Sequence, residues 1–319
     1  MKKKLALVAI GGNALVKDVK MPTLQNQMIA VQEACYPVVD LVEAGWQVVI
    51  THGNGPQVGY LMRRSELAQA ELPLIPMEII VADTQGGIGY QIQQSLANEF
   101  RRRGMDRKIA TVITQVLVDE DDPAFSNPTK PIGGFMTEEE ADFRRGNDGW
   151  VVMEDAGRGW RRVVASPTPK AILESEAIKA LVDQGFIVVC VGGGGIPVIE
   201  KAGELQGVAA VIDKDYASSL LAKELQADAF LVTTAVEKVA IHYGKPEQKN
   251  LDHITMSEAV RYMAEGHFPP GSMGPKMSAV LGYLAGGSGE GIITSPNRLV
   301  MSINGESGTR ITVDYPSGI

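Results

Sequence analysis

The chain has 319 residues, and its 38 acidic and 30 basic side chains give a formal net charge of −8. Hydrophobic residues make up 45% and charged residues 21% of the sequence, which is ordinary for a globular protein and excludes extended disorder. The acidic balance disfavours a broad nucleic-acid-binding face, so no nucleic-acid partner is expected.

The sequence also lacks the marks of a membrane or secreted protein. No apolar run approaches the roughly 18 residues that a membrane helix needs. The lysine-rich start and the apolar run Leu5–Ile10 imitate a signal peptide, but the run stops at a glycine pair and no cleavage pattern follows. Cys35 and Cys190 form neither a Cys-x-x-Cys motif nor a disulfide framework. We therefore expect a cytoplasmic protein with a buried strand at residues 5–10.

The first part of the chain alternates strand and helix signals. After the strand at 5–10, helical spacing covers about residues 25–42, and a second strand covers 48–50. Helical stretches follow at about 58–70 and 78–102, and residues 109–118 are β-rich.

Residues 119–166 differ from the regular pattern on either side. They contain three prolines, a glycine pair at 133–134, several charges and two hairpin-like stretches at 150–154 and 160–165. This composition predicts an inserted subdomain that acts as a mobile lid.

The alternation then resumes. Helices are predicted at about 170–184, 216–225, 257–265 and 276–285, and strands at 186–191, 230–233, 292–295 and 309–313. Strands that alternate with helices predict an α/β fold whose mostly parallel sheet is covered on both faces.

Three of the predicted strands end in glycine-rich turns, at residues 11–12, 53–59 and 192–195. Open α/β sheets bind ligands at the carboxyl ends of their strands, and a glycine turn before a helix offers bare N–H groups to a phosphate. One such turn could serve backbone geometry alone, whereas three favour an anion site. The sequence has no Walker A motif and no Gly-x-Gly-x-x-Gly, so this site would be built from separate loops.

Three lysines stand in constrained sequence settings. Lys130 precedes a proline, Lys214 lies between Asp213 and Asp215, and Lys276 follows a Gly-Pro pair. Phosphoryl transfer requires positive charge placed on the transferring oxygens. Each lysine alone could be an ordinary surface charge. The two aspartates could orient Lys214, hold a metal or cap the helix that follows.

Taken together, seven segments resemble the signature blocks of the carbamate kinases. They occur in the family's order at residues 11–15, 51–59, 122–133, 161–167, 192–198, 210–215 and 271–276. The resemblance implies the amino-acid-kinase fold, a single domain built as a three-layer α/β/α sandwich with a small protruding subdomain at about 119–166. It also implies a phosphotransferase that interconverts ATP and carbamate with ADP and carbamoyl phosphate, and that makes ATP in arginine catabolism.

The same resemblance implies roles for individual residues. Four would be catalytic, namely Lys130, Lys214, Asp215 and Lys276, with Lys130 supplied by the insert. The carbamate and phosphate side would be held by Gly11, Gly12, Asn13, Gly53, Asn54 and Gly55. The nucleotide side would use Thr233, Tyr243, Met273 and Gly274.

The resemblance further implies that residues 1–205 bind the carbamoyl side and residues 206–319 the nucleotide. Mg²⁺ would be held mainly through the nucleotide phosphates, with no protein residue assigned to it, and the enzyme would be a homodimer.

Two alternatives remain open at this stage. Acetylglutamate kinases of the same fold place a lysine two residues before the first glycine pair, where this chain has Ala9. Lys130 would supply that charge instead, but another acyl-phosphate-forming kinase with a different small acid substrate is an alternative. A regulatory nucleotide-binding protein without catalysis is disfavoured by the intact set of lysines.

Overall fold

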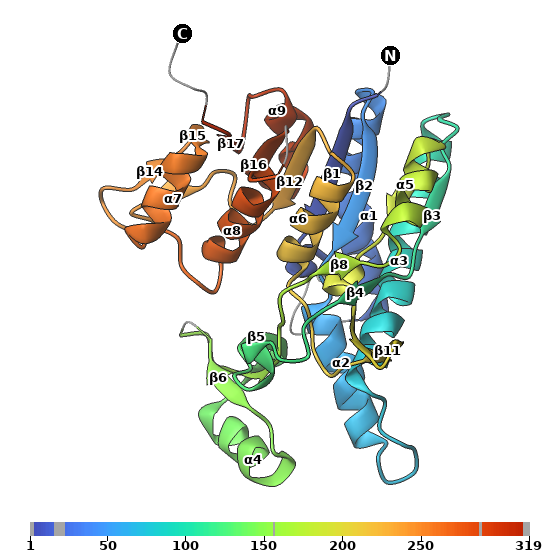
Figure 1. The fold of residues 1–319 in the computed structure, drawn as a ribbon, viewed down its shortest axis with the longest axis vertical. Helices are drawn as coiled ribbons and strands as arrows, with labels where there is room; N and C mark the ends of the chain where they lie inside the picture. The colour runs from blue at the N-terminus through green and yellow to red at the C-terminus, as the bar shows by residue number, and fades with distance from the viewer. Residues whose placement is uncertain (1–2, 16–22, 156, 287–288, 315–319) are drawn as a thin grey trace.

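A central eight-stranded sheet dominates the computed structural model, which describes residues 3–15, 23–155, 157–286 and 289–314 (Figure 1). In spatial order its strands are β15 (His253–Thr255), β17 (Thr309–Thr312), β16 (Glu290–Thr294), β12 (Ala229–Thr233), β1 (Leu5–Ile10), β2 (Gln47–His52), β9 (Ile187–Val189) and β3 (Ile109–Thr111).

The sheet is mostly parallel. β1 pairs in parallel with β2 and β12, and the same direction continues through β16, β9 and β3. β17 runs antiparallel to β16 and parallel to β15, so these two strands at one edge are reversed. The carboxyl ends of β1, β2, β9 and β12 therefore meet at one edge of the sheet, and the glycine turns follow there.

Helices cover both faces because successive side chains of a strand point to opposite sides. In β1, Leu5, Leu7 and Ala9 belong to one buried cluster, and the intervening Ala6, Val8 and Ile10 belong to another. The first cluster is completed by α5 (Ser175–Asp183), α6 (Lys214–Glu224), α7 (Met256–Ala264) and α8 (Met273–Leu284). The second is completed by α1 (Leu24–Glu43), α3 (Met77–Arg102) and α9 (Leu299–Ile303). The predicted three-layer α/β/α fold is confirmed.

Smaller sheets accompany the main sheet. One has the order β11 (Glu204–Gly207), β10 (Ile196–Lys201), β4 (Gln115–Leu117) and β8 (Ala171–Ile172). A two-stranded ribbon joins β13 (Ala240–Ile241) to β14 (Lys249–Asn250). Short 3-10 turns occupy Gly12–Leu15, Pro123–Phe125, Gly192–Gly194 and Pro296–Arg298.

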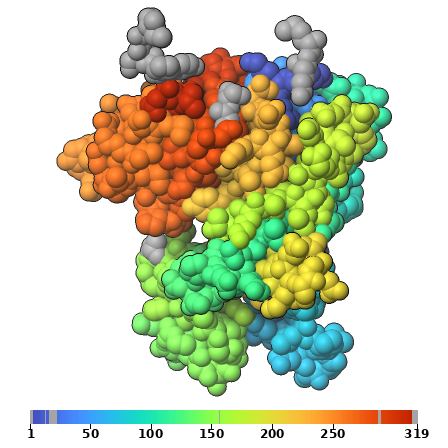
Figure 2. All heavy atoms as spheres, in the orientation of Figure 1, coloured from blue at the N-terminus to red at the C-terminus, as the bar shows by residue number. Residues whose placement is uncertain are grey.

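The insert forms a unit of its own beside α2 (Gly55–Leu67). Its antiparallel sheet has the order β5 (Lys130–Met136), β7 (Trp160–Val164) and β6 (Val152–Glu154), and it carries α4 (Glu138–Asp148). Figures 1 and 2 show this green unit at the lower end of the molecule, the same end that the light-blue segment with α2 occupies.

Several predicted boundaries were wrong. The two stretches read as separate hairpins form a single hairpin, in which β6 pairs with β7. The helix expected from about residue 170 begins at Ser175, because Ala171 and Ile172 pair with β4 instead. Residues 109–118 do not form one β region, since β3 and β4 belong to different sheets. Helix α4 was not predicted, although Thr137 and Glu140 form a capping box at its start.

Candidate functional site

Two glycine turns touch at the carboxyl edge of β1 and β2. A Cβ added to Gly53 would lie 2.7 Å from the backbone nitrogen of Gly12 and 3.3 Å from Cδ of Lys214. Only glycine allows the two backbones to come this close. The contact places main-chain groups of both turns next to the Lys214 side chain, where they could receive an anion.

Asp215 holds two lysines together at this edge. Lys214 Nζ lies 2.5 Å from Asp215 Oδ1, and Lys276 Nζ lies 2.9 Å from Asp215 Oδ2. The Lys214 side chain is 9% exposed and that of Asp215 is 5% exposed. Lys214 and Asp215 belong to the first turn of α6, and Lys276 to the first turn of α8, which explains why one carboxylate reaches both ammonium groups.

Burial and charge act in opposite directions within this cluster. Burial lowers the pKa of Lys214 below its usual value, and Asp215 opposes that shift. Burial alone would raise the pKa of Asp215, but the ammonium groups of Lys214 and Lys276 outweigh it and hold the pKa below its usual range. Asp215 is therefore ionised and fixes two positive charges at one place.

Lys130 reaches the site from the insert and pairs with Asp213. The Asp213 carboxylate serves two partners, since Oδ2 accepts from Lys130 and Oδ1 accepts from the backbone N–H of Asp215 at 2.9 Å. The second bond caps α6, so one of the alternatives considered for this aspartate is confirmed. The first bond was not predicted, because Lys130 and Asp213 are 83 positions apart in sequence.

The end of β2 is tied to α6 by a chain of hydroxyl groups. Thr51 and Ser218 share a hydrogen bond of 2.6 Å, and the Ser218 hydroxyl donates to the backbone carbonyl of Lys214 at 2.5 Å. The neighbouring His52 is buried, and burial lowers its pKa to about 4, with Lys214 adding to the effect. His52 is thus a neutral, packed side chain at neutral pH.

Asn54 is buried. Its amide donates to the Thr84 hydroxyl at 2.9 Å and does not cap α2. The third glycine turn packs against it, because a Cβ on Gly193 would lie 2.0 Å from Asn54 Nδ2. The bonds to Thr84 and the packing of Gly193 position the Gly53–Gly55 turn.

The remaining predicted residues are spread more widely. Thr233 is buried at the end of β12, where its hydroxyl donates to the carbonyl of Ala9 and accepts from the N–H of Gly11.

The other predicted residues lie on different elements. Met273 and Gly274 begin α8, the helix that carries Lys276. Tyr243 is 64% exposed in the loop after β13. The side chain of Asn13 lies outside the described residues, and Gly55 opens α2.

Sequence reasoning missed Thr84, Ser218 and the Lys130–Asp213 pair. The only available signal was the position of Asp213 next to Lys214.

Within the described ranges, no cluster of three His, Cys, Asp or Glu side chains could hold a metal ion.

None of the described helices is long and apolar enough to cross a membrane.

The model of the amino acid kinase family matches residues 4–295. The chain is 48% identical to the carbamate kinase of Thermococcus kodakarensis over 97% of its own length and 99% of that protein. This chain belongs to the carbamate kinases of the amino acid kinase family. It is also 52% identical to the carbamate kinase-like protein YahI of Escherichia coli, over 97% of this chain and 99% of YahI.

Solved structures of carbamate kinases share its architecture. The carbamate kinase of Giardia lamblia bound to AMP-PNP superposes with a TM-score of 0.89 at 42% identity, covering 98% of this chain and 99% of that one. The same enzyme bound to citric acid gives a TM-score of 0.94 at 40% identity.

Proposed function

We propose that this protein is a carbamate kinase that transfers a phosphoryl group reversibly between ATP and carbamate, giving ADP and carbamoyl phosphate. The observation that carries the proposal is the cluster in which Asp215 holds Lys214 and Lys276 beside the touching turns of Gly12 and Gly53. This protein carries the cluster and is 48% identical to a carbamate kinase over nearly its whole length.

The chemistry requires little beyond placement and charge. An oxygen of carbamate forms a bond to the γ-phosphorus of ATP, the bond from that phosphorus to the β–γ bridging oxygen breaks, and ADP leaves with the electron pair. Negative charge on the transferring oxygens is stabilised by fixed positive groups. Lys214 and Lys276 would provide these groups, and Asp215 would hold them in position before the substrate arrives.

The remaining anion contacts would come from the glycine turns and the insert. Backbone N–H groups at Gly11, Gly12 and Gly53 would bind phosphoryl oxygens, with Asn13, Asn54 and Gly55 completing the substrate side. Lys130 would close on the site from the insert as a third cation. Closure of such a segment excludes water, which would otherwise compete for the phosphoryl group.

The nucleotide would lie on the side of residues 206–319, near Thr233, Tyr243, Met273 and Gly274. The Giardia enzyme bound to AMP-PNP supports adenine-nucleotide binding.

The chain fits a role for Mg²⁺ bound through the nucleotide phosphates. Both oxygens of Asp215 are taken by lysines, and the described residues offer no three-ligand cluster of their own. When bound, the ion would neutralise charge on the phosphates.

Family resemblance supports three further parts of the proposal. The enzyme would be a homodimer, would work in the cytoplasm, and would generate ATP during arginine catabolism.

A coupled assay of ATP formation from ADP and carbamoyl phosphate tests the reaction. We expect turnover by the wild type and strongly reduced turnover by Lys214→Ala. Turnover of acetyl phosphate without turnover of carbamoyl phosphate would favour a kinase for another small acid. No ATP from either substrate would contradict the proposal.

A further inference from the structure

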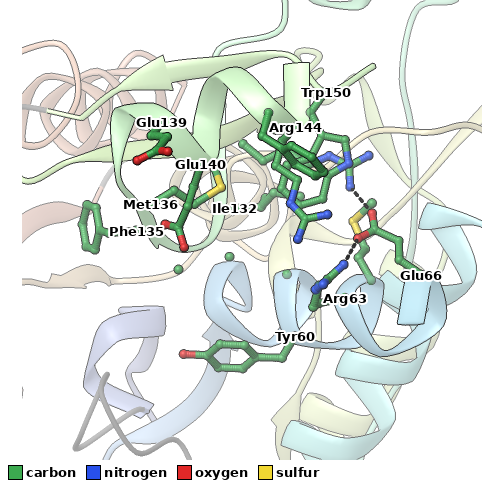
Figure 3. A pocket seen from close by; sticks show the side chains of 16 residues that line it. Tyr60, Arg63, Glu66, Ile132, Phe135, Met136, Glu139, Glu140, Arg144 and Trp150 are labelled. Carbon is green, nitrogen blue, oxygen red and sulfur yellow. Dashed lines mark hydrogen bonds and ion pairs between the residues drawn. The ribbon is translucent and has the colours of Figure 1, made fainter. Parts of the chain in front are cut away.

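A cavity of about 530 Å³ lies between α2 and the insert (Figure 3). Its volume is in the range of sites that hold small organic ligands. None of the residues assigned above to the phosphoryl site lines it, so the cavity is separate from the Lys214–Asp215–Lys276 cluster.

Helix α2 forms one wall of the cavity, and the insert forms the other. Helix α2 contributes Met62 and Arg63, and the insert contributes Phe143 of α4 and Arg162 of β7. The core and the insert touch at Gly59 and Gly133, which both line the cavity. A Cβ on Gly59 would lie 2.0 Å from Cα of Gly133. A molecule in the cavity would therefore contact the core and the insert at the same time.

Three guanidinium groups line one side of the cavity. Arg162 Nη1 donates to Glu66 Oε1 at 2.7 Å, and Arg144 Nη1 donates to Asp148 Oδ2 at 2.6 Å. Arg63 has only a loose ion pair, with its Nη1 3.6 Å from Glu66 Oε2. Since Glu66 already serves Arg162, the three arginines share two carboxylates, and Arg63 is the least tightly paired of them.

The other acidic residues of the lining lie away from Arg63. Figure 3 shows Glu139 and Glu140 on the opposite side of the cavity from Arg63 and Glu66. Glu140 also accepts the N–H of Thr137 in the capping box of α4. The cavity thus has distinct basic and acidic sides.

Apolar and aromatic side chains also line the cavity. Phe143 is 57% exposed, and Met62, Ile132 and Tyr60 also line the cavity. Trp150 is covered by guanidinium groups, with Arg162 4.5 Å and Arg144 5.3 Å from its ring centroid. A flat apolar body could replace water over Phe143 and Met62 while an anionic group meets Arg63.

We propose that this cavity is a second ligand site, which binds an amphipathic anion with a planar apolar body and one carboxylate or sulfonate. The body packs between Phe143 and Met62, and the anionic group pairs with Arg63. The site is distinct from the sites proposed for the nucleotide and carbamoyl phosphate.

A matched pair of fluorescent probes tests this proposal. 8-Anilinonaphthalene-1-sulfonate has an aromatic body and one anionic group, and N-phenyl-1-naphthylamine has the same body without the sulfonate. Each probe is titrated into the full chain as wild type, Arg63→Gln and Phe143→Ser. Both positions are exposed, so the variants are expected to fold and to keep their turnover, which thermal unfolding and the coupled assay verify.

In the absence of ADP and carbamoyl phosphate, the wild type is expected to bind the sulfonate at one saturable site. Loss of a charge-assisted contact should weaken its binding to Arg63→Gln about tenfold or more. The neutral probe should bind the wild type and Arg63→Gln equally, and Phe143→Ser should weaken both probes. The proposal is overturned if the sulfonate shows no saturable binding, or if either variant binds it as the wild type does.

Discussion

The edge of the main sheet and the insert place lysines in different ways. At the edge, Lys214 and Lys276 stand on core helices and share the buried carboxylate of Asp215. Lys130 instead stands on a strand of the insert, is more exposed, and pairs with Asp213 across the boundary between the two parts. One set of charges is fixed by the fold, and the other depends on where the insert lies.

The core and the insert also differ in the contacts that hold each of them together. The core helices bury continuous apolar clusters against the sheet. The insert is stabilised to a larger degree by arginines stacked on aromatic rings, with Arg158 and Arg161 over Phe135 and Arg162 over Trp150. Such contacts are individually weaker than burial of a large apolar side chain. On this comparison we predict a rigid cationic site on the core and a movable cation on the insert.

Removal of a core lysine should have the largest effect on activity. Lys214→Ala and Lys276→Ala are each expected to lower kcat by about 10²–10³, because a preorganised charge stabilises mainly the transition state. Their KM values should change much less. Steady-state kinetics of ATP formation measure both constants, and a variant with near wild-type kcat would remove that lysine from the catalytic set.

Moving the two glycine turns apart should have the second-largest effect on activity. Gly53→Ala forces a Cβ to within 2.7 Å of the Gly12 nitrogen, so the backbones must move apart. Turnover of carbamoyl phosphate should fall sharply, whereas calorimetry should show nearly unchanged ADP affinity. Gly87→Ala in α3, where no atom lies within 4 Å of the added Cβ, is the matched control and should remain active. Parallel loss of ADP affinity and turnover in Gly53→Ala would mean that the two sides of the site are misassigned.

Two substitutions at Asp213 distinguish its role in positioning Lys130 from its role in capping α6. Asp213→Asn can still accept the N–H of Asp215 but loses the charge that pairs with Lys130. We expect a reduced kcat/KM and an unchanged melting temperature. Asp213→Ala loses the cap as well, which should lower the free energy of unfolding by about 1 kcal/mol. A kcat/KM for Asp213→Asn equal to that of the wild type would show that the pair with Lys130 has no role in turnover.

The sequence was sufficient for the fold because strands and helices leave local signals, whereas the roles of the lysines were implied by the family resemblance. Alternating apolar segments predict the sheet and its helices, and glycine turns indicate where the strands end. Helix α4 leaves a weaker signal, the capping box of Thr137 and Glu140, since Ala141 is its only buried residue. Ala171 and Ile172 have apolar spacing that fits a helix, but their pairing with β4 determines their conformation.

Contacts between distant segments could not be predicted from local patterns. The Asn54 amide could have capped α2, and only the packed structure directs it to Thr84 on α3. The partner of Lys130 likewise depends on how the insert folds back on α6. The site residues were therefore easier to propose than the bonds that position them.

Hydrogen exchange of the whole chain, with and without ADP and carbamoyl phosphate, tests the contrast between the two regions most directly. Peptides from residues 119–166 should gain protection when both ligands are present, because we predict that the insert closes over the site with Lys130. Peptides from the interior of β1, β2 and α6 should already be protected without ligand and should change little. Equal protection of residues 119–166 in both states would contradict the account of a fixed core site completed by a moving lysine.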